Sequence, residues 1–419
     1  MKNNSICALD LGSSKASAMV CVFNRQGKII DMTMESVSSK GIKAGHIVNF
    51  SELSASVETL LNKLQKSSKL KIKELYTNVS GSEVTTRHSR AIMPLAERGN
   101  KVITDADLYR IREEARVLGT SLQDEIIHQI PFGYIVDGDN FCLNPRELYA
   151  HRLEVDLYLI YAKLSYIQGI TRLLHQLGYS IKAVFYSGFT SAKLALGQGK
   201  RYGIDIFCDI GADLTDLVMF KDKILQKIEV LTRGADDITV AISRNLNIPF
   251  ELAEEIKRRS AVVGEQEDLS LDKEVMVNKD NAYVPIKQRE ISQIATQSCS
   301  SMCMAIKEAV NKMAEGGTVN SLFIAGRSAI QEGLLEKLEE LSGIPTKLVR
   351  IPAHMFLNND IHNELASSYI KTLTYLNSFA LIVFAWESAQ ENNIFRNAPS
   401  LKSLSGIANK VKQVYQQYF

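Results

Sequence analysis

Apolar residues near the start of the chain run in short stretches that are rich in β-branched side chains. Three of these stretches, 5–11, 16–23 and 29–34, are separated only by turn residues at 12–15 and 24–28. Short apolar stretches joined by turns are typical of neighbouring antiparallel strands. The pattern therefore predicts a three-stranded antiparallel meander at the N-terminal end of the chain.

The same arrangement returns in the second half of the chain. Its predicted strands are 205–211, 215–220 and 224–231. The segments ALDLGSSKASAMVCVF and CDIGADLTDLVMF align with Asp10 on Asp209 and with Gly12 on Gly211. Self-similarity of this kind indicates a repeated structural unit. We therefore expect an internal duplication, in which each half begins with a strand, a tight turn that carries an acid and a glycine, and a second strand.

Apolar residues at intervals of three and four predict helices around and after the meanders. These helices are expected at 50–65, 105–118, 166–177, 238–246, 249–258, 291–313 and 330–341. Ser51 is the expected cap of the first helix, and Thr104 followed by Asp107 is the expected cap of the second. A strand at 319–325 is expected to run directly into a loop at 326–328.

Two segments have no counterpart in the other half and are expected to be insertions. Residues 84–160 mix strands around 92–94 and 154–160 with one capped helix, which predicts an inserted α+β subdomain. Residues 264–285 are polar and have little periodicity, so they predict a short strand ribbon with loops.

The end of the chain changes character twice. Residues 387–400 lose their periodicity and predict a linker. Beyond them, apolar and aromatic side chains recur at intervals of three and four opposite Lys410 and Lys412, which predicts an amphipathic helix over 401–419. These apolar positions are Leu401, Leu404, Ile407, Val411, Val414, Tyr415, Tyr418 and Phe419. Such a helix suits a groove on its own protein or an anionic membrane, and its acid-free polar face favours the membrane.

The charge of the chain is unevenly distributed. The 419 residues contain 49 Lys and Arg and 47 Asp and Glu, which gives a formal net charge of +2. No carboxylate side chain follows Glu391, whereas four basic residues do, namely Arg396, Lys402, Lys410 and Lys412. The tail therefore carries +4 and the rest of the chain, with 45 basic and 47 acidic residues, carries −2. This balance argues against a nucleic-acid partner.

The cysteines and apolar runs bear on the compartment. The six cysteines form no CxxC pair, and the chain has neither a secretory signal nor an apolar run near the about 20 residues that span a bilayer. Reduced thiols in a cytoplasmic body are therefore expected.

The two turns carry the residue types that phosphate and magnesium require. Backbone N–H groups and hydroxyls of a glycine-containing turn can donate hydrogen bonds to phosphate oxygens, while Asp10 and Asp209 orient waters on Mg²⁺. The turn residues are Asp10, Gly12, Ser13, Ser14 and Lys15 in the first half, and Asp209, Gly211, Thr215 and Asp216 in the second. A single turn of this type is usually only a hairpin. Two turns related by duplication could close around one nucleotide.

The segments ALDLGSSK, CDIGADLTD and FIAGRSAIQEG are similar to the phosphate-one, phosphate-two and adenosine motifs of the actin, Hsp70 and sugar-kinase superfamily. Within it the chain resembles the FtsA family of bacterial cell-division proteins over nearly its whole length, including SKGIKAGHIVNF, IHQIPFGYIVDG and TRGADDIT. The resemblance implies an α/β fold: an actin-like duplicated ATPase of two domains around a nucleotide cleft, with an inserted α+β subdomain and a C-terminal amphipathic helix.

The resemblance also implies how the chain divides. The first domain comprises 1–83 and 161–197, and the second comprises 198–234 and 312–386. Residues 84–160 are the inserted subdomain, used for self-association and for later division proteins. Residues 235–311 are the lobe that receives the FtsZ tail. The linker 387–400 and the helix 401–419 attach the protein to the inner membrane, where the family forms filaments that tether the FtsZ ring at the division site.

The resemblance assigns further residues to the nucleotide. Gly234, Glu254 and Lys257 match residues near the ribose and base, and Gly326 and Ser328 match the adenosine loop. The chain departs from the family pattern at Ala212, Asp213 and Arg327, where glycines are usual. A Cβ at Ala212 restricts positive φ and the Asp213 carboxylate repels the terminal phosphate, while Arg327 could stack on adenine. We therefore expect ATP and Mg²⁺ to bind more weakly, with little turnover.

Two other functions fit parts of the pattern. A small-molecule kinase of the same superfamily would use the same turns, but no residue is placed as its catalytic base and the tail would have no purpose. An adaptor of type IV pilus machinery shares the insertion but generally lacks the tail helix. The expectation is a structural adaptor that is at most a weak ATPase.

Overall fold

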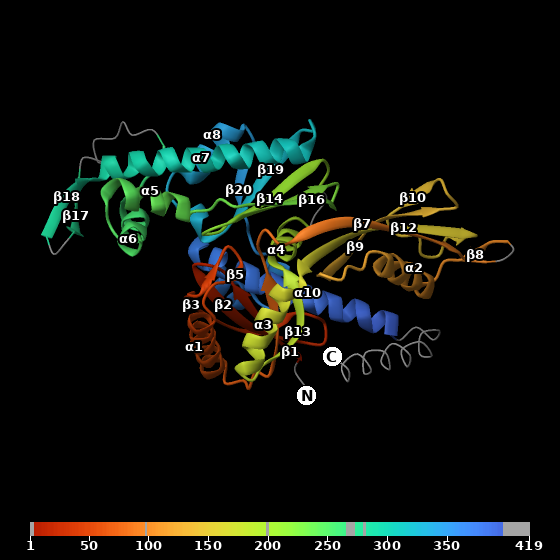
Figure 1. The fold of residues 1–419 in the computed structure, drawn as a ribbon. Coiled ribbons are helices and arrows are strands. Elements are labelled where there is room, and N and C mark those ends of the chain that lie inside the picture. The colour runs from red at the N-terminus through yellow and green to blue at the C-terminus, as the bar shows by residue number, and fades with distance from the viewer. Residues whose placement is uncertain (1–3, 97–98, 198–200, 265–272, 280–281, 397–419) are drawn as a thin grey trace. The chain divides into compact units, whose positions relative to one another are not determined.

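The computed structural model describes residues 4–96, 99–197, 201–264, 273–279 and 282–396 (Figure 1). The chain forms two compact units, which are described separately. The first comprises Met1–Glu83 and Gln168–Ile382, and the second comprises Val84–Ile167 and Val383–Phe419. The predicted site residues of both turns and of the adenosine loop all belong to the first unit.

The first half of the first unit is built on a five-stranded sheet in the order β13-β6-β1-β2-β3. Its strands are β1 (Asn4–Leu11), β2 (Lys15–Phe23), β3 (Ile29–Ser38), β6 (Glu74–Val79) and β13 (Ser180–Tyr186). β1, β2 and β3 are antiparallel neighbours, whereas β6 and β13 are parallel additions. The predicted N-terminal meander is confirmed. β2 is buried along almost its whole length because both faces of the sheet are covered, which explains its unbroken apolar run.

Helices and short strands complete this half. They are β4 (Ile42–Lys43), β5 (His46–Ile47), α1 (Phe50–Ser68), α3 (Leu164–Gln176) and α4 (Ser187–Leu196). In α1 the buried residues Leu53, Val57, Leu60, Leu61 and Leu64 form the apolar stripe that predicted the helix. Its cap is Asn49, whose side chain accepts from the N–H groups of Ser51 and Glu52, so the predicted cap Ser51 is wrong. The cap is the residue just before Phe50, where the helix begins, and not the serine that follows Phe50.

The second half repeats this plan in a sheet with the order β16-β15-β14-β19-β20. Its strands are β14 (Ile204–Ile210), β15 (Thr215–Lys221), β16 (Ile224–Leu231), β19 (Val319–Ala325) and β20 (Thr346–Leu348). Again the first three strands are antiparallel and the last two are parallel to β14 and β19. The order of strands along each sheet is the same in both halves, so the predicted duplication is confirmed.

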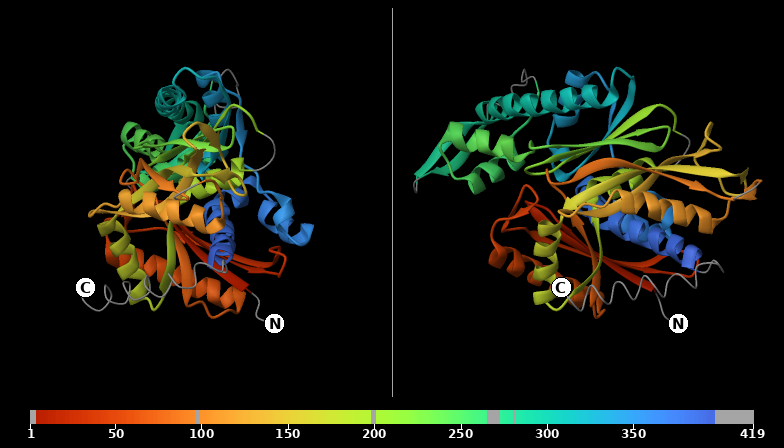
Figure 2. Two further views of the ribbon diagram at one scale, coloured as in Figure 1. Left: turned by 90° about the vertical axis from the view of Figure 1, so that its right-hand side faces the viewer. Right: turned by 45° about the vertical axis from the view of Figure 1, so that its right-hand side comes forward.

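Of the helices in the second half, the first four lie close to predicted ranges, whereas the last two have no predicted counterpart. The helices are α5 (Asp236–Leu246), α6 (Phe250–Ser260), α7 (Gln288–Ala314), α8 (Leu334–Ser342), α9 (Asn359–Ala366) and α10 (Tyr369–Arg396), with the short 3₁₀ helices η2 (Arg327–Ile330) and η3 (Ala353–Met355). The hairpin β17 (Glu274–Lys279) and β18 (Ala282–Lys287) confirms the predicted ribbon, and α7 runs from it over the second sheet (Figures 1 and 2).

Two predictions for this half are corrected. Helix α8 starts at Leu334 rather than at residue 330, because Gly333 has a φ of 79° and separates η2 from α8. The predicted linker 387–400 is wrong up to Arg396, because α10 continues that far. The Glu, Ala and Gln residues in this stretch favour helix, and extending an existing helix costs little free energy. The helix therefore continues although the sequence has no apolar stripe here.

The second unit contains a four-stranded antiparallel sheet in the order β10-β9-β12-β7. Its elements are β7 (Thr85–Pro94), β8 (Lys101–Val102), α2 (Asp105–Leu118), β9 (Asp124–Val136), β10 (Asn140–Cys142), β11 (Tyr149–Ala150) and β12 (Arg152–Lys163). The buried side of α2 packs with the sheet in one core that includes Leu108, Ile111 and Leu157. Thr104 and Asp107 form a capping box, which confirms the predicted cap of α2.

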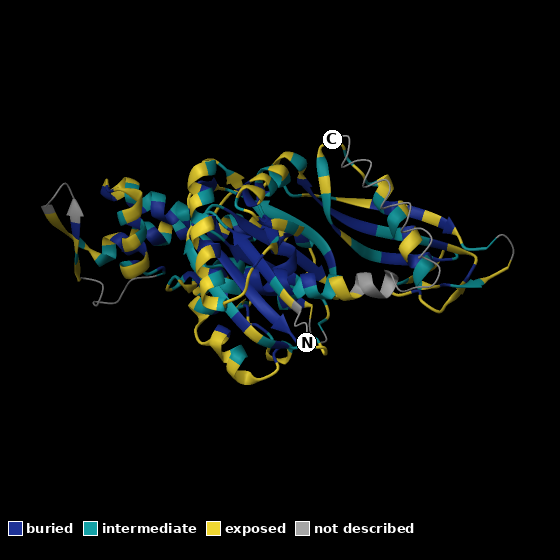
Figure 3. Cartoon of the chain, turned by 90° about the horizontal axis from the view of Figure 1, so that it is seen from below, coloured by how far each residue is buried: buried dark blue, intermediate teal, exposed yellow. Residues whose placement is uncertain are grey.

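Burial follows the sheets in both units (Figure 3). The strands are mainly dark blue in that view, and the exposed residues lie largely on the outer faces of helices and in loops. All six cysteines are free thiols, as expected. Within the residues that the structure describes, no helix is long and apolar enough to cross a membrane.

Candidate functional site

The two predicted turns have equivalent backbone geometry. The N–H of Gly12 donates to the carbonyl of Lys15 at 3.0 Å, and the N–H of Gly211 donates to the carbonyl of Leu214 at 2.9 Å. A Cβ on Gly12 would lie 3.0 Å from the carbonyl oxygen of Lys15, and one on Gly211 would lie 2.9 Å from that of Leu214, so a side chain would crowd both turns in the same way. The alignment of Gly12 on Gly211 is therefore confirmed in three dimensions.

The acids that precede the turns are equivalent as well. Asp10 pairs with Ser17 across β1 and β2, and Asp209 pairs with Asp216 across β14 and β15. Each aspartate is the penultimate residue of the central strand of its sheet and stands two residues before the turn glycine. The duplication thus places two acids and two tight turns in corresponding positions.

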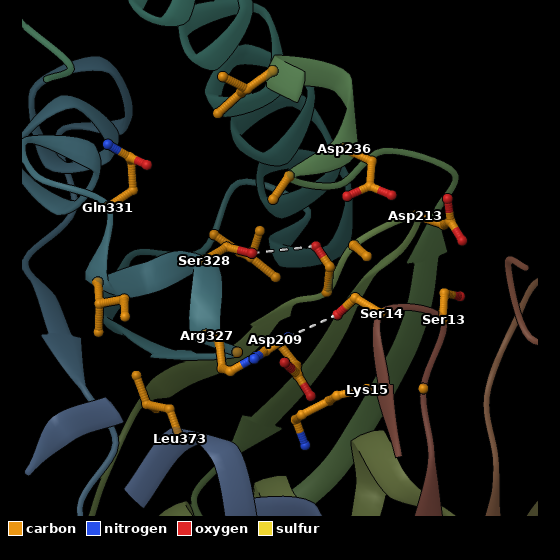
Figure 4. Close-up of a pocket in the computed structure, with 18 of the residues that line it drawn as sticks. Ser13, Ser14, Lys15, Asp209, Asp213, Asp236, Arg327, Ser328, Gln331 and Leu373 are labelled. Atoms are coloured by element: carbon orange, nitrogen blue, oxygen red, sulfur yellow. Dashed lines mark hydrogen bonds between the residues drawn. The ribbon is translucent and has the colours of Figure 1, made fainter. Parts of the chain in front are cut away.

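Both turns and the loop after β19 line one cavity of about 570 Å³ (Figure 4). Its volume lies within the about 300–1,000 Å³ that is usual for small-ligand sites. The predicted site residues that line it are Asp10, Gly12, Ser13, Ser14, Lys15, Asp209, Gly211, Ala212, Asp213, Asp216, Glu254, Lys257, Gly326, Arg327 and Ser328. Residues from segments more than three hundred positions apart in the sequence therefore meet at one place.

Two predicted residues do not line this cavity. The Thr215 hydroxyl is fully buried and donates to the carbonyl of Arg233 at 2.9 Å. Gly234 lies behind the second turn, where a Cβ would be 2.2 Å from the carbonyl oxygen of Ala212. The N–H groups of Ala235 and Asp236 then donate to the carbonyls of Gly211 and Ala212 at 3.0 and 2.9 Å. These contacts brace the second turn from the segment that follows β16, in which Gly234 lies outside the cavity whereas Ala235 and Asp236 line it.

Asp10 sits in a network that the sequence did not indicate. The buried Asp10 carboxylate accepts from the amide of Asn78 at 2.9 Å and from Nζ of Lys15 at 3.3 Å. Nζ of Lys15 also donates to the carbonyl of Thr374 in α10. The Lys15 ammonium is therefore held between Asp10 and α10.

The acids of the second half are buried and close together. The pKa of Asp209 is raised to about 6, mainly by burial and further by the negative charge of Asp10. The side-chain amide of Asn377 donates to Asp209 at 3.2 Å, which lowers the pKa in part. Burial, followed by the charge of Asp209, raises the pKa of Asp216 to about 7. The Tyr186 hydroxyl donates to Asp216 at 2.9 Å. This part of the cavity wall therefore takes up protons near neutral pH.

The backbone of the second turn at Ala212 and Asp213 differs from what the sequence predicted. Neither Ala212 nor Asp213 adopts a positive φ, so the expected restriction by the Cβ of Ala212 is wrong. The equivalent turn of the first half carries serines at these positions, which means that the backbone there suits ordinary residues. The Asp213 carboxylate accepts from the N–H of Ala44 at 2.9 Å, in the connection between β4 and β5 of the first half.

A third group of residues comes from α5 and α6. Nζ of the buried Lys257 lies 2.5 Å from the Glu254 carboxylate and 2.7 Å from the Thr239 hydroxyl. Burial alone would raise the pKa of Glu254, but Lys257 and its hydrogen bonds outweigh this and lower it. Burial raises the pKa of the neighbouring Asp236 to about 6. The pair of Glu254 and Lys257 is thus a fixed, charged part of the wall.

The loop after β19 is tightly folded. Gly326 has a φ of 86°, and a Cβ there would lie 2.1 Å from the carbonyl oxygen of Ile210. The Ser328 hydroxyl donates to the carbonyl of Gly211 at 3.4 Å. Nη2 of Arg327 donates to the Ser14 hydroxyl at 3.1 Å, so the guanidinium extends toward the first turn (Figure 4).

The remaining predictions concern a metal and the membrane. Among the described residues, no three His, Cys, Asp or Glu side chains are grouped so that they could hold a metal ion directly. Asp10 and Asp209 both line the cavity, which leaves the expected water-mediated role as a prediction. Residues 401–419, which were predicted to bind the membrane, lie outside the described residues.

Comparisons with known proteins agree with this fold. Residues 81–161 match the family described as "SHS2 domain inserted in FTSA", and residues 206–413 match "Cell division protein FtsA". The cell division protein FtsA of Borreliella burgdorferi is 23% identical over 416 residues, which cover 98% of each chain.

Two solved structures share the fold. A structure of the PilM–PilN type IV pilus biogenesis complex has a TM-score of 0.60 at 15% identity and covers 91% of this chain and 98% of that one. MreB5 of Spiroplasma citri bound to ADP has a TM-score of 0.51 at 11% identity and covers 94% and 99%. Together with the duplicated sheets, the inserted subdomain and the family matches, these findings show that the chain has an actin-like fold and belongs to the FtsA family of cell-division proteins.

Proposed function

We propose that this protein binds ATP, self-associates into actin-like filaments on the cytoplasmic membrane and anchors the FtsZ ring there. One observation carries the nucleotide part of the proposal: two equivalent turns, each preceded by an aspartate near the end of a central strand, line the same cavity. Family membership supports the division role, and the ADP-bound MreB5 structure of the same fold supports a nucleotide as the ligand.

The residues of the cavity suit the parts of ATP. Backbone N–H groups of both turns and the hydroxyls of Ser13 and Ser14 donate to phosphate oxygens. Glu254 and Lys257 hold the ribose and base end, beside the loop at 326–328. Asp10 and Asp209 would orient waters on Mg²⁺, which neutralises phosphate charge when it is bound. With several acids around the turns, binding is expected to be weaker than two glycine-rich loops would provide.

Attachment to the membrane rests on the C-terminal segment. Its basic face adds about 1 kcal/mol per Lys near an anionic surface, so burial of its apolar stripe must supply the rest. One such helix binds reversibly, and filament formation multiplies the number of anchors. The lobe at 235–311 is proposed to receive the FtsZ tail, and the subdomain at 84–160 to contact later division proteins.

The membrane part is tested by sedimentation with anionic liposomes. The full chain is expected to sediment with lipid, and a chain lacking residues 401–419 is expected to stay in the supernatant. A matched control that replaces only Lys410 and Lys412 by Gln separates charge from apolar burial and should bind with intermediate strength. Sedimentation of the truncated chain with lipid would reject the tail as the anchor.

The division role is tested by electron microscopy on anionic lipid monolayers with ATP and FtsZ. The full chain is expected to form filaments that recruit FtsZ, and the truncated chain to form none on the lipid. Absence of FtsZ from monolayers coated with the full chain would contradict the adaptor role. Phosphoryl transfer from ATP to a sugar or to acetate would instead favour a small-molecule kinase.

A further inference from the structure

Arg327 occupies an unusual position in the cavity. It follows Gly326, whose positive φ fixes the direction in which the chain leaves β19. From there its guanidinium reaches the first turn, where Nη2 donates to the Ser14 hydroxyl at 3.1 Å. Ser14 belongs to the turn whose backbone is proposed to hold phosphate. The side chain therefore reaches the phosphate side of the cavity, where its hydrogen bond joins it to the first turn.

The other cations of the cavity already have anionic partners. Lys15 is paired with Asp10, and both Lys257 and Arg258 are paired with Glu254. Arg327 differs, because within the described part of the chain no carboxylate lies within ion-pair distance of its guanidinium. Its only hydrogen-bond partner there is the neutral Ser14 hydroxyl.

The surroundings penalise this unpaired charge. Burial, followed by the neighbouring Arg258 guanidinium, lowers the pKa of Arg327. A partly buried cation gains most from an anion that brings several strong acceptors, and a planar guanidinium matches the oxygens of a phosphate with two parallel hydrogen bonds. An exposed Arg–Ser hydrogen bond is weak by comparison and is easily exchanged.

We propose that Arg327 binds the phosphates of the nucleotide directly, exchanging its hydrogen bond to Ser14 for phosphate oxygens. This inference rests on the proposed nucleotide site and specifies how that site recognises its ligand. The guanidinium takes over part of the charge neutralisation that Mg²⁺ supplies, so binding depends on the number of phosphates and less on the metal. The earlier expectation that Arg327 stacks on adenine places the same side chain at the opposite end of the ligand.

Calorimetric titration of the full chain separates these two placements. ATP, ADP, AMP and adenosine are each titrated into wild type, Arg327→Ala and Arg327→Lys, with Arg350→Ala as a control because Arg350 is exposed and outside the cavity. Arg327→Ala is expected to weaken ATP and ADP binding by about 10- to 100-fold and to leave adenosine unchanged. Arg327→Lys should restore part of the affinity, because it returns the charge without the planar fork.

The metal dependence gives an independent readout. Removing Mg²⁺ with EDTA should weaken ATP binding by a larger factor in Arg327→Ala than in wild type, because the variant has lost the other source of positive charge. Unchanged adenosine binding by the variant also shows that it is folded.

Several results would overturn the inference. If Arg327→Ala loses affinity for adenosine and ATP by the same factor, Arg327 contacts the base. If Arg327→Ala binds ATP more tightly than wild type does, the Arg327 side chain obstructs the site. An equal metal effect in both proteins removes the shared role with Mg²⁺. If the wild-type chain binds none of the four ligands, the proposed nucleotide site itself is rejected. If the wild type binds ATP and Arg327→Ala binds it equally well, only the role of Arg327 is rejected.

Discussion

The two turns that face the cavity share a backbone and differ in their side chains. In each, a glycine N–H donates to the carbonyl three residues on, and an aspartate is the penultimate residue of the strand before it. The first turn continues with two serines and a lysine, whereas the second continues with Ala212, Asp213 and Leu214. The first turn therefore offers hydroxyl donors to a ligand, and the second offers only backbone donors beside a carboxylate.

The strands behind the turns differ in the same direction. The strand partner of Asp10 is Ser17, whereas the partner of Asp209 is a second acid, Asp216. Lys15 neutralises the acid of the first half, but the equivalent residue in the second half is the apolar Leu214. The second half therefore concentrates buried negative charge, and cations that offset it at the phosphate side must come from other elements. The duplication therefore gives both halves the same turn backbone, whereas their side chains give the first half a paired acid and the second half two buried acids.

The pair of acids should make stability depend on pH. Because the folded pKa of Asp216 is raised to about 7, from an unfolded value near 4, the folded state binds more protons between those values. The contribution is fully present below about pH 4 and is lost as pH rises through 7, which amounts to up to about 4 kcal/mol. Asp216→Asn keeps an acceptor for Tyr186 and should flatten this decline in the free energy of unfolding, measured by urea denaturation from pH 4 to 7.5.

The control for this prediction is Asp139→Asn, which changes an exposed acid in the second unit. Asp216→Asn is expected to match wild type at pH 4 and to exceed its stability at pH 7.5. Parallel stability curves for wild type and Asp216→Asn would mean that the buried pair does not bind the extra proton, and the contrast between the two halves would lose its electrostatic basis.

A smaller effect is expected from the bracing of the second turn. Gly234→Ala places a Cβ 2.2 Å from the carbonyl oxygen of Ala212, which the backbone must move to accommodate, at a cost of about 2 kcal/mol. Gly12→Ala brings its Cβ only to 3.0 Å from the carbonyl of Lys15 and should cost less than about 1 kcal/mol. Thermal and urea unfolding of both variants would measure the difference, and equal losses would show that the second turn is not braced from behind.

The sequence predicts the residues of this site that belong to a motif present in both halves of the chain, and it misses several of those that do not. The aspartates and glycines of the two turns were identified because the same pattern occurs twice, and the structure brings all of them to one cavity. Asn78 and Asn377 were missed because neither belongs to a repeated motif, and the carboxylate that each contacts lies far away in sequence. Only the folded chain brings Lys15 to the carbonyl of Thr374, 359 residues later.

The wrong assignments have equally local causes. Thr215 is only one residue from Asp216, but neighbouring side chains of a strand point to opposite faces, so the hydroxyl turns away from the cavity. Residues 387–396 lack an apolar stripe and still continue α10. Apolar periodicity identifies a helix through its apolar stripe, so it gives no signal where the sequence lacks such a stripe.

The smallest expected effect concerns the acid of the second turn. Asp213→Gly and Asp213→Asn both remove the carboxylate, but only Asn keeps an acceptor for the N–H of Ala44. Both are expected to tighten binding of a fluorescent ATP analogue by about threefold without Mg²⁺ and by less with it, because the metal screens the repulsion. Affinities equal to that of wild type in both variants would show that Asp213 does not weaken the site.

The central claim is that both turns hold a single nucleotide. Amide hydrogen exchange of the full chain, with and without Mg²⁺ and ATP, tests it most directly because each turn is followed separately. We expect ATP to slow exchange at 12–15, at 211–214 and at 326–328 together, over the same range of ATP concentration. Protection confined to one turn, or protection of the two turns at different ATP concentrations, would contradict the claim.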